Sequence, residues 1–488
     1  MWGHAQFAAV TEQPAATTAL VSAAALAALY SSYHVVKSVL ADRAIRRVLA
    51  KQGIHQPSST LPLLGNTLDT QFDIFGRGDE LLDVLHDLFG DGIVGVDGAK
   101  WKEQRRVGSH LFSMQMLRDV MDEVVIEKTQ QLCDVLSSCA KQGKVVSIKS
   151  LLSKFTSDVF TKIGFGVDLH GLSGDVDVEY EHPFIQAVAG FGPVFQSRAN
   201  SPMWFWKLKR FLSIGDEGQF KKDAKIVHDL IRDIMVESMA NKTAKARDSK
   251  TPPRRDLLTL YVESSGTTDV MAVRDIVMNF FLAGKDTTSF SMSWFFVMLN
   301  RHPRVLHKIR EEIRINLPTL ATGELKVPTM EDLQKLPYLE AAIKESLRLY
   351  MSAVHRTPSR STTLSDGTFV PFGTYVIMSA YAAGRMTSTW GPDATEFRPE
   401  RMLDPETGKV KNFSPFKLVS FIGGPRQCLG MRFAILEMKT AMATVLSRFD
   451  ITTIEDPFDI TYEISLVIPV KGDLRVTVNE LAPSPAAS

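Results

Sequence analysis

The chain of 488 residues is poor in cysteine and almost neutral, and each shortage excludes a class of protein. Its three cysteines, Cys133, Cys139 and Cys428, are too few and too irregularly spaced for a disulfide framework, which favours a reducing, cytosol-facing compartment. Because 56 basic residues nearly balance 55 acidic ones, neither a nucleic-acid-binding surface nor an acidic scaffold is expected. The sequence also lacks internal repeats. Its function must therefore be sought in local motifs.

Charged side chains are also missing from the stretch between Gln13 and Val36, and basic residues follow it from Lys37 to Lys51. Because about 20 apolar residues span a bilayer, we predict a membrane anchor here, with the basic flank holding the rest of the chain in the cytosol. A cleaved signal peptide fits less well, since its basic residues would precede the apolar run. We therefore divide the chain into an anchor with a basic linker (residues 1–56), a globular domain (57–482) and a disordered tail (483–488).

Hydrophobic periodicity separates a long helical region from a shorter region with strands. From Glu80 to about Ile315 the pattern is that of amphipathic helices, whereas strand signals appear late, in Gly367–Ser379 and Ile460–Val478. The polar, proline-bearing segment Lys242–Asp256 is typical of an exposed loop. The predicted fold class is therefore mainly α with a smaller β-rich portion, that is, α+β.

The segment FIGGPRQCLG, Phe421 to Gly430, surrounds Cys428 with the features that a metal-binding thiolate needs. Gly424 and Gly430 remove side-chain bulk, Arg426 supplies a fixed cation, and Phe421 can cover the sulfur. The helix-forming run that follows would direct the partial positive charge of its N-terminus at Cys428. A buried structural cysteine would leave the surrounding positions unexplained.

This segment resembles the haem-binding loop of the cytochrome P450 family, FxxGxRxCxG, at all five fixed positions. The resemblance implies a cytochrome P450 fold and haem b as the cofactor, with Cys428 as the thiolate ligand of its iron and Arg426 as a partner of a haem propionate. The domain over residues 57–482 would then be the haem-thiolate catalytic domain.

A second motif, AGKDTT, lies in a long apolar run that Pro303 closes. The part of this run from Ile276 to Leu299 has the length of a membrane span, but Lys285 and Asp286 at its middle would be costly in lipid. We therefore predict a helix that is apolar on most faces and is buried inside the protein.

AGKDTT resembles the oxygen-activating segment of the same family. The resemblance implies that Ala283 and Gly284 leave room over the iron, while Asp286 and Thr287 act as the catalytic pair that delivers protons. Alternatively, the Thr287 hydroxyl bonds back to a carbonyl one turn earlier and bends the helix. The two roles are compatible, because a local widening is what an oxygen pocket needs.

Two further motifs resemble the family's helical signatures. Trp101 and Arg105, one turn apart in WKEQR, match WxxxR, whose members bind a haem propionate. Glu345 and Arg348 in ESLR, together with Arg401, resemble the family's Glu-Arg-Arg cluster, which has a structural role beneath the haem.

Another propionate ligand is expected after the helix that carries ESLR. The sequence there reads MSAVHRTPSRS, and both Arg356 and Arg360 remain candidates.

Several stretches, among them FLAGKDTTSFSMSWFF and WGPDATEFRPERML, look more specifically like the microsomal fatty-acid ω-hydroxylases. This likeness implies a monooxygenase at the endoplasmic reticulum membrane that inserts one oxygen atom from O2 into a C–H bond of a lipophilic substrate, here a fatty acid. Its electrons would come from NADPH–cytochrome P450 reductase. Candidates for an apolar substrate lining are Phe281, Ala283, Val354 and Leu466. Two alternatives stay open: a haem-thiolate isomerase or dehydratase, which would not need a proton relay, and an inactive haem-binding protein.

The interval between Pro62 and Trp101 is short for this family, at 39 positions (101 − 62). At roughly 11 residues per helix and 5–6 per strand, it cannot hold the first helix, the first strands and the helices that cover the substrate. We therefore predict that the first helix and first β-strands are missing, through a shortened gene model or a real deletion. Such a loss would expose a sheet edge and open the substrate channel.

Overall fold

The computed structural model describes residues 74–112, 118, 121–172, 182–245, 256–265, 269–463, 465 and 467–482. The predicted anchor and the predicted tail lie outside these ranges. In the described ranges, no helix combines the length and the hydropathy that crossing a bilayer requires. The chain divides into two compact units, and the described part of the smaller one is Arg360–Thr374, with the antiparallel pair β4 (Thr362–Thr363) and β5 (Phe369–Val370).

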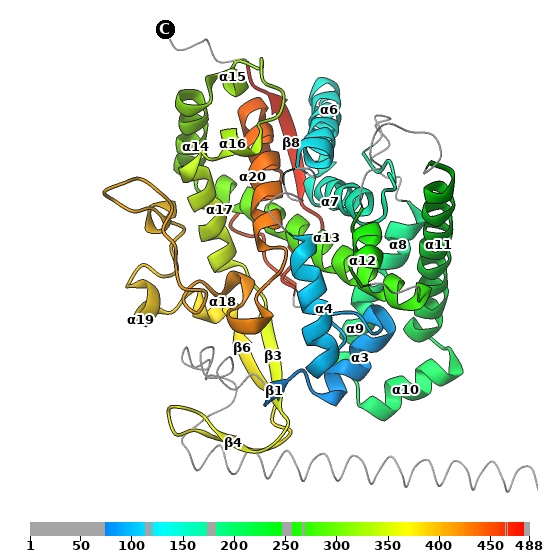
Figure 1. The fold of residues 1–488 in the computed structure, drawn as a ribbon. Helices are drawn as coiled ribbons and strands as arrows, with labels where there is room; N and C mark the ends of the chain where they lie inside the picture. Colours follow the sequence, from blue (N-terminus) through cyan, green and yellow to red (C-terminus); the bar gives the residue numbers. More distant parts are fainter. Residues whose placement is uncertain are drawn as a thin grey trace, which may run out of the picture. The chain divides into compact units, whose positions relative to one another are not determined.

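Helices dominate the larger unit, which confirms the mainly helical prediction (Figure 1). The α-helices are α3 (Asp79–Phe89), α4 (Gly98–Leu111), α6 (Ile126–Gln142), α7 (Ile148–Phe165), α8 (Pro183–Ala189), α9 (Phe191–Ala199), α10 (Met203–Leu212), α11 (Asp216–Lys245), α12 (Leu257–Ser265), α13 (Val270–Arg301), α14 (Pro303–Asn316), α15 (Pro318–Ala321), α16 (Met330–Leu333), α17 (Pro337–Leu349), α18 (Ala380–Ala383), α19 (Thr387–Trp390) and α20 (Met431–Arg448). Short 3-10 turns are η2 (Pro399–Met402), η3 (Val419–Phe421) and η4 (Gly424–Arg426), and η1 (Met121–Val125) is a π-helical turn.

Helix α13 runs through the core and confirms the prediction of a buried helix. Asp269 caps its N-terminus by accepting a hydrogen bond from the Met271 N–H at 2.9 Å, and it ends before Pro303 because proline cannot continue the helix. Its neighbours include α7, α17 and α20. The cavity described below lies along this helix, so α13 positions much of the site.

Two three-stranded antiparallel sheets flank the helices. One has the order β1 (Phe75–Gly76), β3 (Ala353–Pro358), β6 (Val376–Ser379), and the other has the order β2 (Val146–Ser147), β8 (Arg475–Glu480), β7 (Phe449–Thr453). The late strand signals were only partly right. In Ile460–Val478 the strand begins only at Arg475. Before it, the described residues are irregular apart from the bridge between Tyr462 and Val470.

Strand β7 was not predicted, because it follows α20 without a glycine or proline. Its partner β8 supplies the ladder that makes it a strand, and its buried residues alternate with more exposed ones. The predicted loss of the first helix and strands concerns residues before 74, which lie outside the described residues; the described part of the interval holds β1 and α3.

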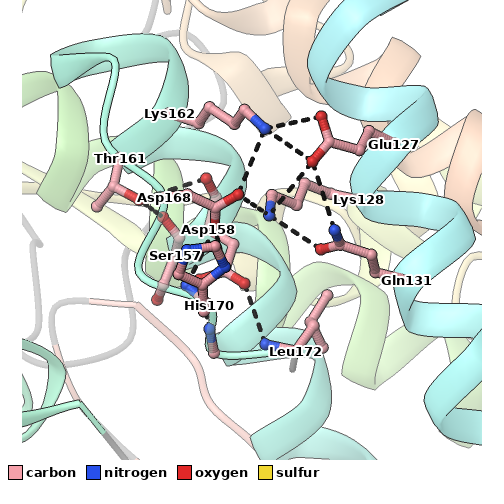
Figure 2. Close-up of polar contacts among 11 residues, drawn as sticks. Glu127, Lys128, Gln131, Ser157, Asp158, Thr161, Lys162, Asp168, His170 and Leu172 are labelled. Carbon is pink, nitrogen blue, oxygen red and sulfur yellow. Dashed lines mark hydrogen bonds and ion pairs between the residues drawn. The ribbon is translucent and has the colours of Figure 1, made fainter. Parts of the chain in front are cut away.

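A buried polar cluster fixes the loop that follows α7 (Figure 2). Lys128 of α6 is fully buried, and its Nζ donates to Asp168 Oδ2 at 2.6 Å and to Gln131 Oε1 at 2.9 Å. Asp158 of α7 accepts hydrogen bonds from the N–H groups of Gly171 and Leu172, at 3.0 and 3.1 Å. A charged lysine is rarely buried unless it is paired, so these contacts hold the loop against α6 and α7.

Candidate active site

A cavity of about 850 Å³ brings together most of the residues that the motifs singled out. Its walls include residues of α3, α4, α7, α8, α9, α13, β3 and the loop before α20. The predicted site residues that line it are Trp101, Arg105, Ala283, Gly284, Asp286, Thr287, Phe421, Arg426, Cys428 and Gly430. Residues far apart in the sequence thus meet around one space.

The loop before α20 presents the Cys428 side chain to the cavity. Its backbone N–H donates to the Phe421 carbonyl at 2.9 Å, and Gly424 turns the chain with a φ of 73°, which glycine adopts readily. Burial raises the pKa of the Cys428 thiol, while the Gly430 N–H and the Arg105 guanidinium act in the opposite direction by stabilising the thiolate. A Cβ on Gly430 would meet just the Phe112 ring, at 3.9 Å, so contacts among the described residues do not demand glycine there.

Helix α4 and the cysteine loop place cations at one side of the cavity. The guanidinium of Arg426 lies 4.5 Å from the centre of the Trp101 ring and also pairs with Asp97. Burial lowers the pKa of both Arg105 and Arg426. An arginine keeps its proton in proteins, so two positive charges lie at this side of the cavity.

Arg77 joins this group, although sequence reasoning missed it. It follows β1, lines the cavity, and its pKa falls to about 9 because of burial and then because of repulsion by Arg356 and Arg426. Its Nε is buried and has no hydrogen-bond partner in the described residues. The position of β1 beside β3 brings Arg77 near Arg356, a pairing that no local motif encodes.

The structure also distinguishes Arg356 from Arg360, the two candidates for the further propionate ligand. Arg356 lies on β3 and acts electrostatically on Arg77, so it belongs with the cationic group. Arg360 is exposed and belongs to the smaller unit, Arg360–Thr374.

In α13, Asp286 and Thr287 form the predicted proton relay, but each makes a hydrogen bond to a different residue. The Thr287 hydroxyl donates to the Ala283 carbonyl at 2.6 Å, which is the back-bond that the sequence left open. Asp286 Oδ1 accepts from the Nζ of Lys285, a buried neighbour, at 2.5 Å. No hydrogen bond between Asp286 and Thr287 is present in the described part of the chain, so the two groups are adjacent without being joined.

Gly284 is needed for helix packing as well as for space. A Cβ at this position would lie 2.0 Å from the Phe160 ring of α7, which fills the notch that the glycine leaves. Gly284 also lines the cavity beside Ala283, so the glycine serves both the packing of α13 on α7 and the space near Thr287.

The apolar wall differs in part from its prediction. Ala283 and Val354 line the cavity, whereas Leu466 lies outside the described residues. Phe281 does not line it: its ring contacts Phe184 at 5.1 Å between centroids, because it points from α13 toward α8. Carbon-rich side chains from α3, α9 and α13 form the wall instead: Leu88, Phe89, Phe191, Phe195, Phe280 and Leu282.

Glu345, Arg348 and Arg401 lie together in a buried cluster away from the cavity. Arg348 holds Glu345 with two hydrogen bonds of 2.8 and 2.7 Å, and Arg401 Nε donates to the same carboxylate at 3.3 Å. Arg348 also donates to the carbonyls of Gly384, Ala394 and Glu396. This cluster therefore ties α17 to the segments that lead to the cysteine loop.

Comparison with known proteins identifies the family. The family model for cytochrome P450 matches residues 68–474. The chain belongs to the cytochrome P450 family. Cytochrome P450 CYP94D108 of Paris polyphylla is 33% identical over 417 residues, which are 85% of this chain and 82% of that protein. Cytochrome P450 94B1 of Arabidopsis thaliana is 34% identical over 396 residues, which are 79% of this chain and 74% of that protein.

Solved structures agree on the fold. The crystal structure of the cytochrome P450DA heme domain superposes with a TM-score of 0.72 at 22% identity, covering 87% of this chain and 88% of that one. The protein is thus a P450-type haem monooxygenase with a cysteine-ligated haem iron as its cofactor. The cavity fits this cofactor, because it combines a cysteine side chain with the guanidiniums of Arg77, Arg105 and Arg426, which suit two propionates.

Proposed function

We propose that this P450 hydroxylates a fatty acid, at or near the end of its chain, with electrons from an NADPH-dependent reductase. The observation that carries the proposal is the apolar wall of the cavity, formed by side chains such as Phe89, Phe191 and Leu282 beside Thr287. An alkyl chain gains about 0.8 kcal/mol per CH2 buried against such a wall. The likeness of the AGKDTT helix to the microsomal fatty-acid ω-hydroxylases points the same way.

For the cofactor, we assign Cys428 as the iron ligand. The Gly430 N–H beside the sulfur and the start of α20 at Met431 support this role, since both favour a thiolate. Phe421 and Gly424 shape the loop around it. When bound, the haem supplies the activation of dioxygen.

Trp101, Arg105 and Arg426 are the proposed partners of the propionates, as the sequence predicted. We add Arg77, and we choose Arg356 over Arg360, because the charges of Arg356 and Arg426 both act on Arg77. The two propionate carboxylates would bring negative charge to this group of guanidiniums.

On the dioxygen side, Asp286 and Thr287 keep their proposed roles as the catalytic pair. Thr287 is exposed to the cavity; its hydroxyl donates backward to Ala283 and so keeps its lone pairs available to accept a proton donor. Lys285 holds the Asp286 carboxylate at the edge of the same space.

The proposed site of action is the endoplasmic reticulum membrane, with the catalytic unit facing the cytosol. Besides the predicted anchor, α10 supports a membrane-facing surface, because Leu208, Phe211 and Leu212 are exposed on it. A helix with an exposed apolar face is suited to a membrane interface.

Helix α4 supports the reductase as redox partner. Its exposed face carries Lys102 and Arg106, one turn apart, while Trp101 and Arg105 of the same helix face the cavity. A basic surface next to the cofactor would attract an acidic flavoprotein domain and accelerate its association at low salt.

The test is reconstitution of the full chain with haem, the reductase, NADPH and a panel of fatty acids that differ in chain length. We expect a hydroxylated product whose mass and fragmentation place the oxygen near the methyl end. The n-alkane of matched length is the control for recognition of the carboxylate. A preparation with the thiolate haem spectrum that consumes NADPH but hydroxylates none of the fatty acids would contradict the proposed substrate.

A further inference from the structure

The cavity changes in chemistry along α13, on either side of Thr287. Toward α3 and α9 its wall consists of aromatic and aliphatic side chains. Toward the start of α7 and the segment before β8 the lining includes a series of hydroxyls beside Val467 and Pro469. We call this series the hydroxyl arm: Ser147, Ser150, Ser153, Thr287, Ser291 and Ser465. Trp294, one turn beyond Ser291, donates to the Ile468 carbonyl at 2.8 Å and so holds that segment against α13.

The outer half of the hydroxyl arm is a row on α7. Ser147, Ser150 and Ser153 are spaced by three residues, which places them on one helix face. No hydrogen bond within the described residues uses the hydroxyl of Ser150 or Ser153, and both side chains are half-buried. Buried water typically makes two to four hydrogen bonds, so this row offers the partners that water needs and the apolar wall does not.

The inner half is built from α13. Ser291 donates to the Thr287 carbonyl at 2.6 Å, and Thr287 donates to the Ala283 carbonyl at 2.6 Å. Each hydroxyl has one O–H to donate and two lone pairs, so both can still accept from water. The arm thus reaches the hydroxyl that we assign to proton delivery.

The outer end opens among charged groups at the surface. Lys149 Nζ donates to the carbonyls of Val470 and Gly472, at 2.8 and 2.7 Å, and so joins the start of α7 to the loop before β8. Asp473 is exposed, lines the cavity, and accepts a hydrogen bond from the Ser147 hydroxyl. Solvent therefore meets the arm at an exposed carboxyl group.

We propose that the hydroxyl arm carries water and protons between solvent at Asp473 and Thr287, separately from the apolar side, which takes the substrate. The inference rests on the proposed function of the same cavity. Monooxygenation, RH + O2 + 2e⁻ + 2H⁺ → ROH + H2O, consumes two protons and releases one water per turnover. An alkyl chain that fills the apolar side would block that route to solvent, so a second one is required.

The test replaces Ser150 and Ser153 together, either by valine or by threonine. Valine and threonine have nearly the same shape and similar helix propensity, so the pair differs in the hydroxyl alone. The turnover of each variant is measured in two reactions, one with O2, NADPH and the reductase and one with an organic hydroperoxide. The second reaction, RH + R′OOH → ROH + R′OH, consumes no protons or electrons from solution.

We expect the double valine variant to lose about tenfold or more in NADPH-driven turnover, at the lower end of what proton-transfer groups contribute, with an increased solvent isotope effect. Its hydroperoxide-driven turnover and its substrate-binding spectrum should match those of the double threonine variant. Crystal structures should show ordered water from Ser150 to Thr287 in the threonine variant and none in the valine variant.

Equal NADPH-driven rates and equal isotope effects in the two variants would overturn the proposal, as would an alkyl chain of bound substrate lying in the arm. Failure of the proposed function is separable from this outcome. In that case the wild-type protein forms no hydroxy fatty acid in either reaction, and the valine–threonine comparison is made with NADPH-driven reduction of O2 to water (4e⁻ + 4H⁺), which also needs protons.

Discussion

At the residue scale, Gly284 sets the distance between α13 and α7. The Phe160 ring of α7 occupies the position where a side chain on Gly284 would be, and the same ring makes an edge-to-face contact with Phe433 of α20 at 5.3 Å. One absent methyl group therefore lets three helices meet beside the cavity. Close-packed interiors tolerate added volume poorly, so this contact is sensitive to substitution.

Gly284→Ala should destabilise the fold by about 1–3 kcal/mol, because Phe160 must move or strain. Gly192→Ala is the matched control: Gly192 is also helical and lines the cavity, but a Cβ there would meet nothing within 4 Å. The control should be neutral or slightly stabilising, since alanine is the better helix former. Urea unfolding of both variants measures the difference, and equal midpoints would contradict the packing argument.

Glu437 of α20 is a buried residue whose environment shifts its pKa. It is fully buried, and neither carboxylate oxygen has a hydrogen-bond partner in the described residues. Burial raises its pKa well above the ordinary range. Because the folded state then holds a proton that the unfolded state has lost, this group makes the protein less stable as pH rises above the unfolded pKa.

Glu437→Gln should remove that dependence, because glutamine is neutral at every pH. The free energy of unfolding of the variant, relative to wild type, should rise with pH above about 4.3 by up to about 1.4 kcal/mol per unit, until the folded pKa is reached. Parallel denaturation curves between pH 5 and 8 would measure it. A stability difference that stays constant over this range would show that Glu437 is already ionised in the folded protein.

At the element scale, a buried arginine joins the helices around the cavity. Arg198 of α9 forms two 2.8 Å hydrogen bonds with Glu217 of α11, and its guanidinium also pairs with Asp87 of α3 at 2.9 Å. The side chain is 1% exposed and stacks over the Trp206 ring of α10. Since Leu88 and Phe89 at the end of α3 line the cavity, this clasp positions its apolar wall.

Arg198→Met should cost about 3–5 kcal/mol, because it leaves Glu217 buried without its cation, whereas Asp87 keeps its pair with Arg210. Hydrogen exchange should accelerate in α3 and α9 in particular. Lys225→Met is the control, since Lys225 and Asp229 form an exposed pair on α11 of the kind worth about 0.3–0.5 kcal/mol. Unchanged exchange in α3 would mean that the clasp does not hold this helix.

Residues in local motifs could be assigned to the site from the sequence, whereas residues brought there by packing between elements could not. That Cys428, Trp101 and Arg105 belong to one site could be predicted, because each belongs to a motif whose spacing is local to one loop or one helix, and all three line the cavity. Arg77 and the serines of α7 were missed, because only the packing of β1 on β3 and of α7 along α13 brings them to the cavity. Phe281 was misplaced, since an all-apolar helix gives no periodic signal of which face meets the cavity.

At the scale of the whole molecule, different elements around α13 supply different parts of the site. The loop before α20 presents the cysteine and Arg426, α4 and the residue after β1 bring two more cations, and α3 and α9 supply the apolar wall. The mainly helical class was predictable because long amphipathic runs dominate the sequence, whereas β7 emerged only from its pairing with β8. The central claim is that Cys428 is the thiolate ligand of the haem.

The absorption spectrum of the reduced, carbon-monoxide-bound protein tests this claim most directly. The wild-type protein should give the red-shifted band of a thiolate-ligated haem, and Cys428→Ser should lose that band while its circular dichroism shows the helical fold retained. Cys133→Ser is the control, because Cys133 is buried in α6 and does not line the cavity, and the band should persist in it. A thiolate band that survives in the Cys428→Ser protein, or that is absent from folded, haem-loaded wild type, would contradict the assignment.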